Sequence, residues 1–158
     1  MARVGRSRGR SLARRCAAQA LYQWQMNHAE PRVILAQLPE SEQTRDAVDR
    51  ERLSVLVVSA IEDHARWQAL LQPLLDRPLN QVDPVEQALL LIGVVELAQC
   101  PDTPYRVVIN EAVELAKLFG GDNSHAFVNS VLDRVARILR PVELKRAAPP
   151  AEERPKEP

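Results

Sequence analysis

Two arginines and a tyrosine near the N-terminus are residue types that suit contact with nucleic acid. Apolar residues recur every three or four positions from about Arg10 to Met26, which predicts an amphipathic helix. In that helix Arg14, Arg15 and Tyr22 fall within about a quarter turn of each other. Guanidinium groups pair with phosphates, and a tyrosine ring offers a surface on which an unpaired base can stack. The pattern therefore indicates single-stranded RNA binding; the alternative is a half-buried core tyrosine beside solvated arginines.

Residues that could support catalysis or bind a metal do not form a recognisable motif. The sequence has no phosphate-binding loop, no Gly-x-Ser-x-Gly and no His-Glu-x-x-His. His28, His64 and His125 are scattered along the chain. Cys16 and Cys100 lie far apart in apolar helical patterns without metal-ligand spacing. We therefore expect no enzyme activity, no cofactor, no metal site, and reduced cysteines in the core.

Charge is distributed unevenly, although the formal net charge is zero. Residues 1–26 contain six arginines and no acidic residue, whereas residues 27–104 contain six basic and thirteen acidic residues. The basic stretch favours contact with phosphates, and the acidic remainder leaves room for a basic protein partner. The alternative is that the basic stretch only keeps a disordered segment in solution. Neither a signal-peptide core nor a membrane-spanning apolar run is present, so we expect a cytoplasmic protein.

Length and composition predict one all-α domain with a tail at each end. With 158 residues, 46% of them hydrophobic but only 4% aromatic, the chain favours helix formers over sheet formers. Residues 1–9 are predicted to form a flexible arginine-rich arm, and residues 141–158 a disordered tail. Helices are expected at about 10–26, 33–38, 53–74 (one helix, or two with a bend near Asp63), 84–98, 105–119 and 124–139.

Local signals mark the ends of the later helices. Asp83-Pro84-Val85-Glu86 combines an N-cap, a first-turn proline and a capping-box glutamate. Gly120-Gly121 predicts a left-handed helix stop, after which Asn123 or a neighbouring residue caps the last helix. Phe119, just before that stop, is expected to face inward with the apolar side of its helix.

A series of short motifs, in order and with matching spacing, resembles the NusB family. The motifs are Ala20-Leu21-Tyr22-Gln23-Trp24-Gln25, Asp83-Pro84-Val85-Glu86, Pro104-Tyr105-Arg106-Val107-Val108-Ile109-Asn110-Glu111-Ala112, Glu114-Leu115-Ala116-Lys117, Phe119-Gly120, Ser124-His125, Phe127-Val128-Asn129 and Val131-Leu132-Asp133. The resemblance covers about Arg10 to Arg140. It implies two packed three-helix subdomains, about 10–75 and 83–140, and a non-catalytic role in transcription antitermination and ribosomal RNA synthesis.

The resemblance also implies partners and the residues that meet them. NusB proteins pair with NusE, a small-subunit ribosomal protein, and the pair binds the single-stranded boxA element of nascent RNA. The RNA-facing residues implied by position are Arg10, Arg14, Tyr22 and Phe127, to which charge and helical phase add Arg8 and Arg15. Glu86 matches a glutamate associated with the NusE contact, where an acidic surface suits a basic protein. Its other interpretation is the capping role, and the two are compatible.

This sequence departs from the family pattern at several positions. Gly9, Ser11 and Leu12 interrupt the arginines of the N-terminal segment, so phosphate contacts are expected to be fewer or shifted. Asn123 stands where many relatives have aspartate, and we include it among the RNA-binding residues. Loss of that negative charge would strengthen RNA binding modestly, whereas Ala126, at a position often basic in relatives, would cancel the gain.

Two other functions compete with antitermination. One is an accessory module like the NusB-like segment found at the front of some ribosomal RNA methyltransferases, although this sequence has no Gly-rich cofactor loop or alternating strand–helix pattern. The other is a helical protein-interaction or dimerisation module with a merely solubilising arm. Under the antitermination hypothesis the partners include RNA polymerase in an antitermination complex. A homodimer could hide the RNA-binding face until NusE or RNA displaces it.

Overall fold

The chain folds as a set of packed α-helices. The structure, a computed structural model, describes residues 2–38 and 41–147, with side chains from Gly5 onward. The helices are α1 (Ala2–Asn27), α2 (Pro31–Gln37), α3 (Glu42–Ala47), α4 (Arg50–Glu62), α5 (His64–Leu71), α6 (Pro84–Gln99), α7 (Tyr105–Phe119), α8 (Ser124–Leu139) and α9 (Pro141–Ala147). Short 3₁₀ turns at Gln72–Leu74 and Leu79–Gln81 join α5 to α6. The predicted all-α class is confirmed, and none of the helices in the described ranges is long and apolar enough to cross a membrane.

The arginine-rich N-terminal segment is helical, so the prediction of a flexible arm over residues 1–9 is wrong for residues 2–9. Met1 lies outside the described residues. The cause is a tertiary contact at Gly9, which is buried. The backbone N–H of Asp49 donates a 3.0 Å hydrogen bond to the Gly9 carbonyl, and a Cβ on Gly9 would lie 3.0 Å from the Ala47 carbonyl. This close approach anchors α1 at the residue just before the start that periodicity alone indicates.

Two further segments are helical where we expected irregular chain. The polar linker contains α3, whose N-cap Ser41 accepts a 3.2 Å hydrogen bond from the Thr44 N–H. This helix buries none of its side chains and so leaves no apolar period in the sequence. Residues 141–147 of the predicted tail form α9, and residues 148–158 lie outside the described part of the chain. The long apolar stripe is divided at Asp63 into α4 and α5, as the second of the two alternatives predicts.

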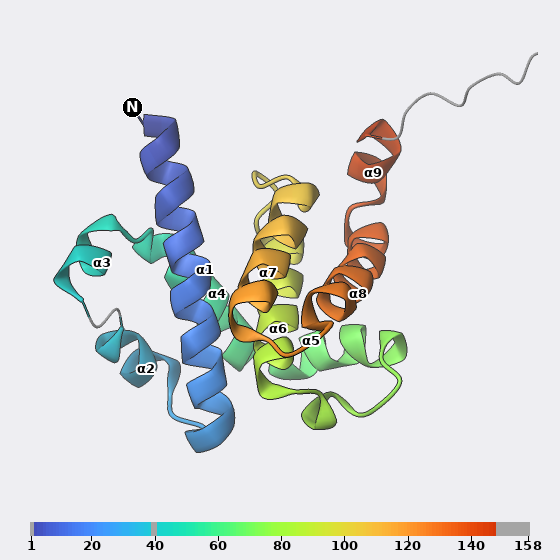
Figure 1. Cartoon of the computed structure of the whole chain (residues 1–158), viewed down its shortest axis with the longest axis horizontal. Helices are drawn as coiled ribbons and strands as arrows, with labels where there is room; N and C mark the ends of the chain where they lie inside the picture. The colour runs from blue at the N-terminus through green and yellow to red at the C-terminus, as the bar shows by residue number, and fades with distance from the viewer. Residues whose placement is uncertain (1, 39–40, 148–158) are drawn as a thin grey trace, which may run out of the picture.

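Helix α6 is the centre of the fold (Figure 1). It packs on α1 and α4 on one side and on α7 and α8 on the other. Residues 87–97 are all buried, as the apolar run on every side of this helix predicts. One hydrophobic cluster includes residues from both halves of the chain, so the halves before and after Arg77-Pro78 share a core.

Carbonyl groups at the C-terminal end of α6 accept hydrogen bonds from a guanidinium group, in place of a left-handed cap. Arg140, buried after α8, donates hydrogen bonds to the carbonyls of Leu97, Cys100 and Thr103 at 2.8, 2.9 and 3.1 Å. The last carbonyls of a helix lack partners within the helix, and a cation there also complements the helix dipole. Arg140 therefore fixes the end of α8 against the end of α6.

Helices α6 and α8 approach closely at Gly93. A Cβ at this position would lie 2.6 Å from both terminal methyl carbons of Leu132. We expect Gly93→Ala to lower the free energy of unfolding by about 1–3 kcal/mol, because the added methyl overpacks a filled core. Urea denaturation measures the change. Gly121→Ala is the matched control, since nothing lies within 4 Å of a Cβ there; equal stability of the two variants would contradict the close approach.

The first half of the fold contains a cluster of two histidines around a tryptophan. The Trp24 ring lies 5.2 Å from the ring of His28 and 5.0 Å from that of His64. Burial, together with the nearby charge of His28, lowers the pKa of His64 below its ordinary value. The buried Nε2 of His64 has no hydrogen-bond partner among the described residues.

This cluster predicts a loss of stability in mild acid. In the unfolded chain His64 takes up a proton near its ordinary pKa, whereas in the folded chain His64 is protonated only at a lower pH. The free energy of unfolding should therefore fall as pH drops from about 7 to about 5. His64→Gln, which cannot titrate, should show a shallower fall when urea midpoints are compared across that range. A variant as pH-dependent as the wild type would remove His64 as the cause.

Candidate nucleic-acid interface

One face of α1 carries two exposed arginines and an exposed tyrosine. Arg8, Arg15 and Tyr22 are seven residues apart, so each lies about 20° around the helix from the previous one. At a rise of about 1.5 Å per residue they span roughly 20 Å of the helix. All three are exposed, and Tyr22 keeps 45% of its surface accessible. The helix thus presents two cations and an aromatic ring in line.

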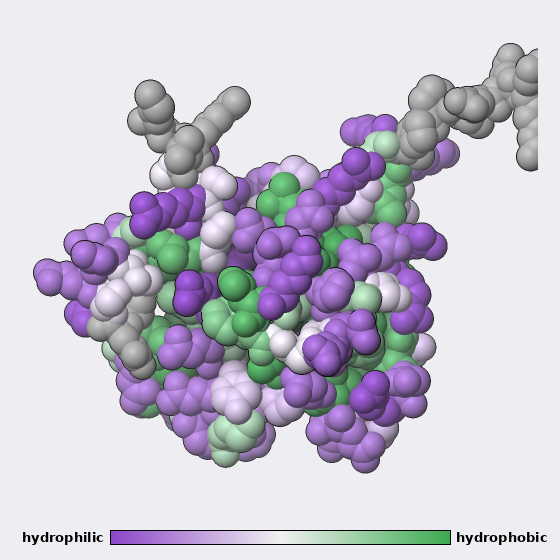
Figure 2. Space-filling view, in the orientation of Figure 1, coloured by the Kyte–Doolittle hydropathy of each residue, from purple (hydrophilic) through white to green (hydrophobic). Residues whose placement is uncertain are grey.

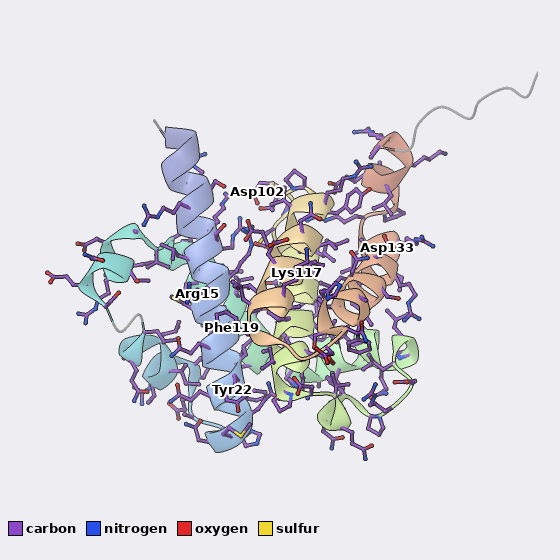
Figure 3. The ribbon with its side chains drawn as sticks, in the orientation of Figure 1. Arg15, Tyr22, Asp102, Lys117, Phe119 and Asp133 are labelled. Carbon is purple, nitrogen blue, oxygen red and sulfur yellow. The ribbon has the colours of Figure 1, made fainter. Side chains whose placement is uncertain are left out.

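A groove of about 350 Å³ runs beside the Arg15 and Tyr22 end of this face. It is lined by Arg15, Ala18, Gln19, Tyr22, Val85, Ala88, Leu89 and Phe119, from α1, α6 and α7. Figure 2 shows hydrophobic surface between α1 and the end of α7, bordered by hydrophilic residues. In Figure 3 Arg15, Phe119 and Tyr22 follow one another along the junction of these helices. The Arg15 guanidinium lies over the Phe119 ring, 5.4 Å from its centroid.

Phe119 is exposed, so the prediction that it faces inward is wrong. It is the last residue of α7, and 48% of its surface is accessible. The chain turns sharply at Gly120, where a Cβ would lie 2.6 Å from both the Ala116 carbonyl and the Ser124 Cβ. Gly120 does not adopt the expected left-handed conformation (φ −85°); Asn123 does, with φ 64°. The tight turn therefore follows directly after Phe119 and ends α7 there.

Arg14 is buried in the core, which corrects its assignment to the RNA-facing surface. Only 2% of its surface is accessible, and its Nε donates hydrogen bonds of 2.8 and 3.1 Å to the two carboxylate oxygens of Glu96. Arg52 of α4 donates to the same carboxylate at 2.7 Å. Glu96 is fully buried, so its charge is balanced by two arginines from two other helices. Arg14 therefore joins α1 to α6 and is not available to phosphates.

Arg10 is only partly available, because carboxylates already surround it. Its Nη2 donates a 2.7 Å hydrogen bond to Asp102, and its Nε lies 3.8 Å from an Asp49 carboxylate oxygen. Burial acts to raise the pKa of Asp102, but Arg52 and Arg10 together outweigh it and hold that pKa below its ordinary value. Asp102 therefore stays ionised at neutral pH and compensates much of the Arg10 charge.

The remaining predicted residues gather around the start of α8. Asn123 is exposed at the N-cap of that helix, and its side chain accepts no capping hydrogen bond. Phe127 is partly buried, with the Arg77 guanidinium 5.9 Å from its ring centroid. The Ser124 hydroxyl donates a 2.8 Å hydrogen bond to the Glu86 carboxylate. That bond brings the first turn of α6 against the start of α8, so Glu86 lies close to Asn123 in space.

The capping role predicted for Glu86 is only half present. Asp83 is the N-cap of α6, and its side chain accepts hydrogen bonds from the backbone N–H groups of Val85 and Glu86. The Glu86 carboxylate points to Ser124, and among the described residues no hydrogen bond returns from it to the Asp83 backbone. Glu86 is therefore a bridge between α6 and α8.

The structure unites some of the predicted residues and separates others. Arg15 and Tyr22 share the groove, whereas Arg14 is buried and Phe127 is not among the residues that line it. Sequence analysis missed Gln19 and Phe119 as lining residues. Gln19 follows Arg15 by one helical turn, a signal that could have placed it on the same face. Within the described residues, no three His, Cys, Asp or Glu side chains gather as metal ligands.

Comparison with known proteins settles the family. The model of the NusB family matches residues 11–137. The transcription antitermination protein NusB of Burkholderia ambifaria is 48% identical over 134 residues, which cover 85% of this chain and 92% of the relative. The chain belongs to the NusB family. The NusB protein of Ralstonia nicotianae is 46% identical over 135 residues, covering 85% of this chain and 86% of that protein. A solved structure of T. maritima NusB is 26% identical in sequence and has a TM-score of 0.74; the match covers 86% of this chain and 96% of the T. maritima chain.

The buried ion pairs make Glu96 a critical residue of this NusB-family chain. Glu96→Gln removes the carboxylate charge that both buried guanidinium groups share. It leaves Arg14 paired with Glu111 at 3.7 Å and Arg52 with the more exposed Asp102 at 3.3 Å. We expect a loss of about 3–5 kcal/mol in the free energy of unfolding, measured by urea denaturation. Glu114→Gln, which removes an exposed carboxylate paired with Lys117, is the control and should change stability little. If the two variants were equally stable, the buried pairs would not hold the helices together.

Proposed function

We propose that this chain is a transcription antitermination factor that binds the boxA element of nascent RNA together with NusE and so supports ribosomal RNA transcription. The observation that carries the proposal is the exposed line of Arg8, Arg15 and Tyr22 on one face of α1. Cations in line suit a phosphate backbone, and an exposed ring suits an unpaired base. The curated relatives, similar over most of their length, carry the name transcription antitermination protein.

Each exposed residue has a separate role in this proposal. Arg8 and Arg15 attract phosphates, with a smaller contribution from Arg10 because Asp102 compensates its charge. Tyr22 stacks on a base at one end of the line. Phe127, partly buried near the start of α8, contributes the part of its side chain that remains accessible. The proposed role is binding and assembly, without catalysis or a cofactor.

The start of α6 and of α8 forms the proposed protein-facing side. Glu86 is partly exposed and its carboxylate is oriented by Ser124, which suits a fixed contact to a basic protein such as NusE. Asn123, exposed beside it, lacks the negative charge that many relatives carry, so repulsion of nearby RNA phosphates is smaller. We include RNA polymerase among the partners of the assembled complex and place its work in the cytoplasm. A homodimer that covers the α1 face is the proposed resting state.

A salt titration tests the RNA-binding role of the α1 face. Binding to a boxA RNA should weaken as salt increases, exceed binding to a scrambled RNA, and tighten when purified NusE is added. Arg15→Gln should reduce the slope of log affinity against log salt by about one, because one phosphate contact is lost. Tyr22→Ala should weaken binding with the slope unchanged.

The control is an exposed cation on another helix. Arg32 of α2 pairs with Glu30 and is largely exposed, so Arg32→Gln should leave both affinity and slope as in the wild type. If Arg15→Gln and Arg32→Gln behaved alike, or if the wild type did not distinguish boxA from scrambled RNA, the α1 face would not be the specific RNA site. NusE binding that persists in Arg15→Gln while RNA binding weakens would exclude a purely protein-interaction module.

A further inference from the structure

The groove between α1, α6 and α7 has a composition suited to one flat ligand group. Its lining combines the small or aliphatic side chains of Ala18, Ala88, Val85 and Leu89 with the aromatic rings of Tyr22 and Phe119. Tyr22 and Phe119 each keep close to half of their surface accessible. Rings left exposed beside an apolar floor favour a partner that removes them from water.

The charged and polar groups of the groove favour an anionic chain over an acidic or neutral protein surface. Arg15 is the one charged residue of the lining, and Gln19 adds an amide that can both donate and accept a hydrogen bond. The guanidinium of Arg15 lies over Phe119, so a cation and a π-surface meet at one edge. Arg8, two turns away on the same face, continues the positive charge beyond the groove. A phosphodiester strand with one base turned inward matches this order of groups.

We propose that the groove holds one unpaired base of the bound RNA, stacked on Phe119, with the amide of Gln19 at the base edge and Arg15 on the adjoining phosphate. This inference rests on the proposed RNA-binding function and adds Phe119 and Gln19 to the residues that contact the RNA. Stacking gives the groove a preference for an unstacked nucleotide, and the Gln19 amide gives it a means of discriminating between bases.

The test combines Phe119 variants with single abasic nucleotides in the boxA RNA, in the presence of NusE. Phe119→Ala should weaken binding about tenfold, as expected for loss of one base–aromatic stack, and Phe119→Tyr should retain wild-type affinity. In the wild type, an abasic nucleotide at one position should weaken binding by a similar factor. At that position alone, the abasic change should not weaken RNA binding by the Phe119→Ala variant any further, because the stack is already absent.

Leu118→Ala is the matched control. Leu118 is adjacent in α7 and 68% exposed, but it does not line the groove, so its loss should leave affinity within about twofold of the wild type. Thermal unfolding followed by circular dichroism checks that each variant is folded, and Phe119→Tyr retains the ring if Phe119→Ala is unstable.

The outcomes separate this inference from the function on which it rests. If the wild type binds boxA RNA but Phe119→Ala and Leu118→Ala bind it equally well, the base site is wrong and the RNA-binding function stands. If Phe119→Ala binds RNA normally and loses NusE, the groove is a protein-docking site and the inference is overturned. If the wild type itself fails to bind boxA RNA, both proposals are wrong. The base site is supported if, at a single nucleotide, the losses of affinity caused by Phe119→Ala and by the abasic change are not additive.

Discussion

The buried carboxylate of Glu96 is a charge that three helices must neutralise together. An isolated carboxylate in a protein interior is costly, and here Arg14 from α1 and Arg52 from α4 both donate to it. Removing Glu96 would leave two guanidinium groups in the core without the carboxylate they share, so the three helices are constrained to one relative position. The apolar packing around α6 supplies most of the burial, whereas the ion pairs determine how α1 is rotated against it.

The rotation of α1 decides which of its arginines faces the solvent. Successive residues in a helix are about 100° apart, so the burial of Arg14 against Glu96 directs Arg15 toward the edge of the helix. There the Arg15 guanidinium meets the ring of Phe119 from α7. Two adjacent residues of one type thus serve different purposes: one fixes the helix in the core, and the other remains on the surface beside the groove.

The fold was largely predictable because apolar periodicity records burial directly. The N-cap Asp83 and the buried character of α6 follow from local patterns, and the division at Asp63 is one of the two alternatives that the apolar stripe allowed. The burial of Arg14 and the ordered start of α1 were missed because they depend on contacts between residues distant in sequence, whereas α3 was missed because it buries no side chain. Glu96 lies 82 residues from Arg14, and Gly9 meets Asp49 through the backbone, so neither contact leaves a local signal.

The candidate site was predicted less completely than the fold. Arg8, Arg15 and Tyr22 are exposed as the helical phase of α1 predicts, whereas the same reasoning placed Arg14 with them. Phe119 continues an apolar period and was therefore predicted to lie in the core, but it is the last residue of α7 and 48% of its surface is accessible. Apolar periodicity indicates which face of a helix is apolar. It does not show at which residue the neighbouring helices cease to cover that face.

The ordered start of α1 has a thermodynamic consequence for recognition. A disordered basic arm that folds on its ligand loses backbone conformational entropy, about 1–2 kcal/mol for each residue fixed, and this offsets part of the attraction. In this chain the helix is formed from Ala2 onward and anchored at Gly9, so folding itself has already ordered the backbone around Arg8. Association at this surface would then resemble the docking of a rigid body, with a small change in heat capacity compared with coupled folding and binding.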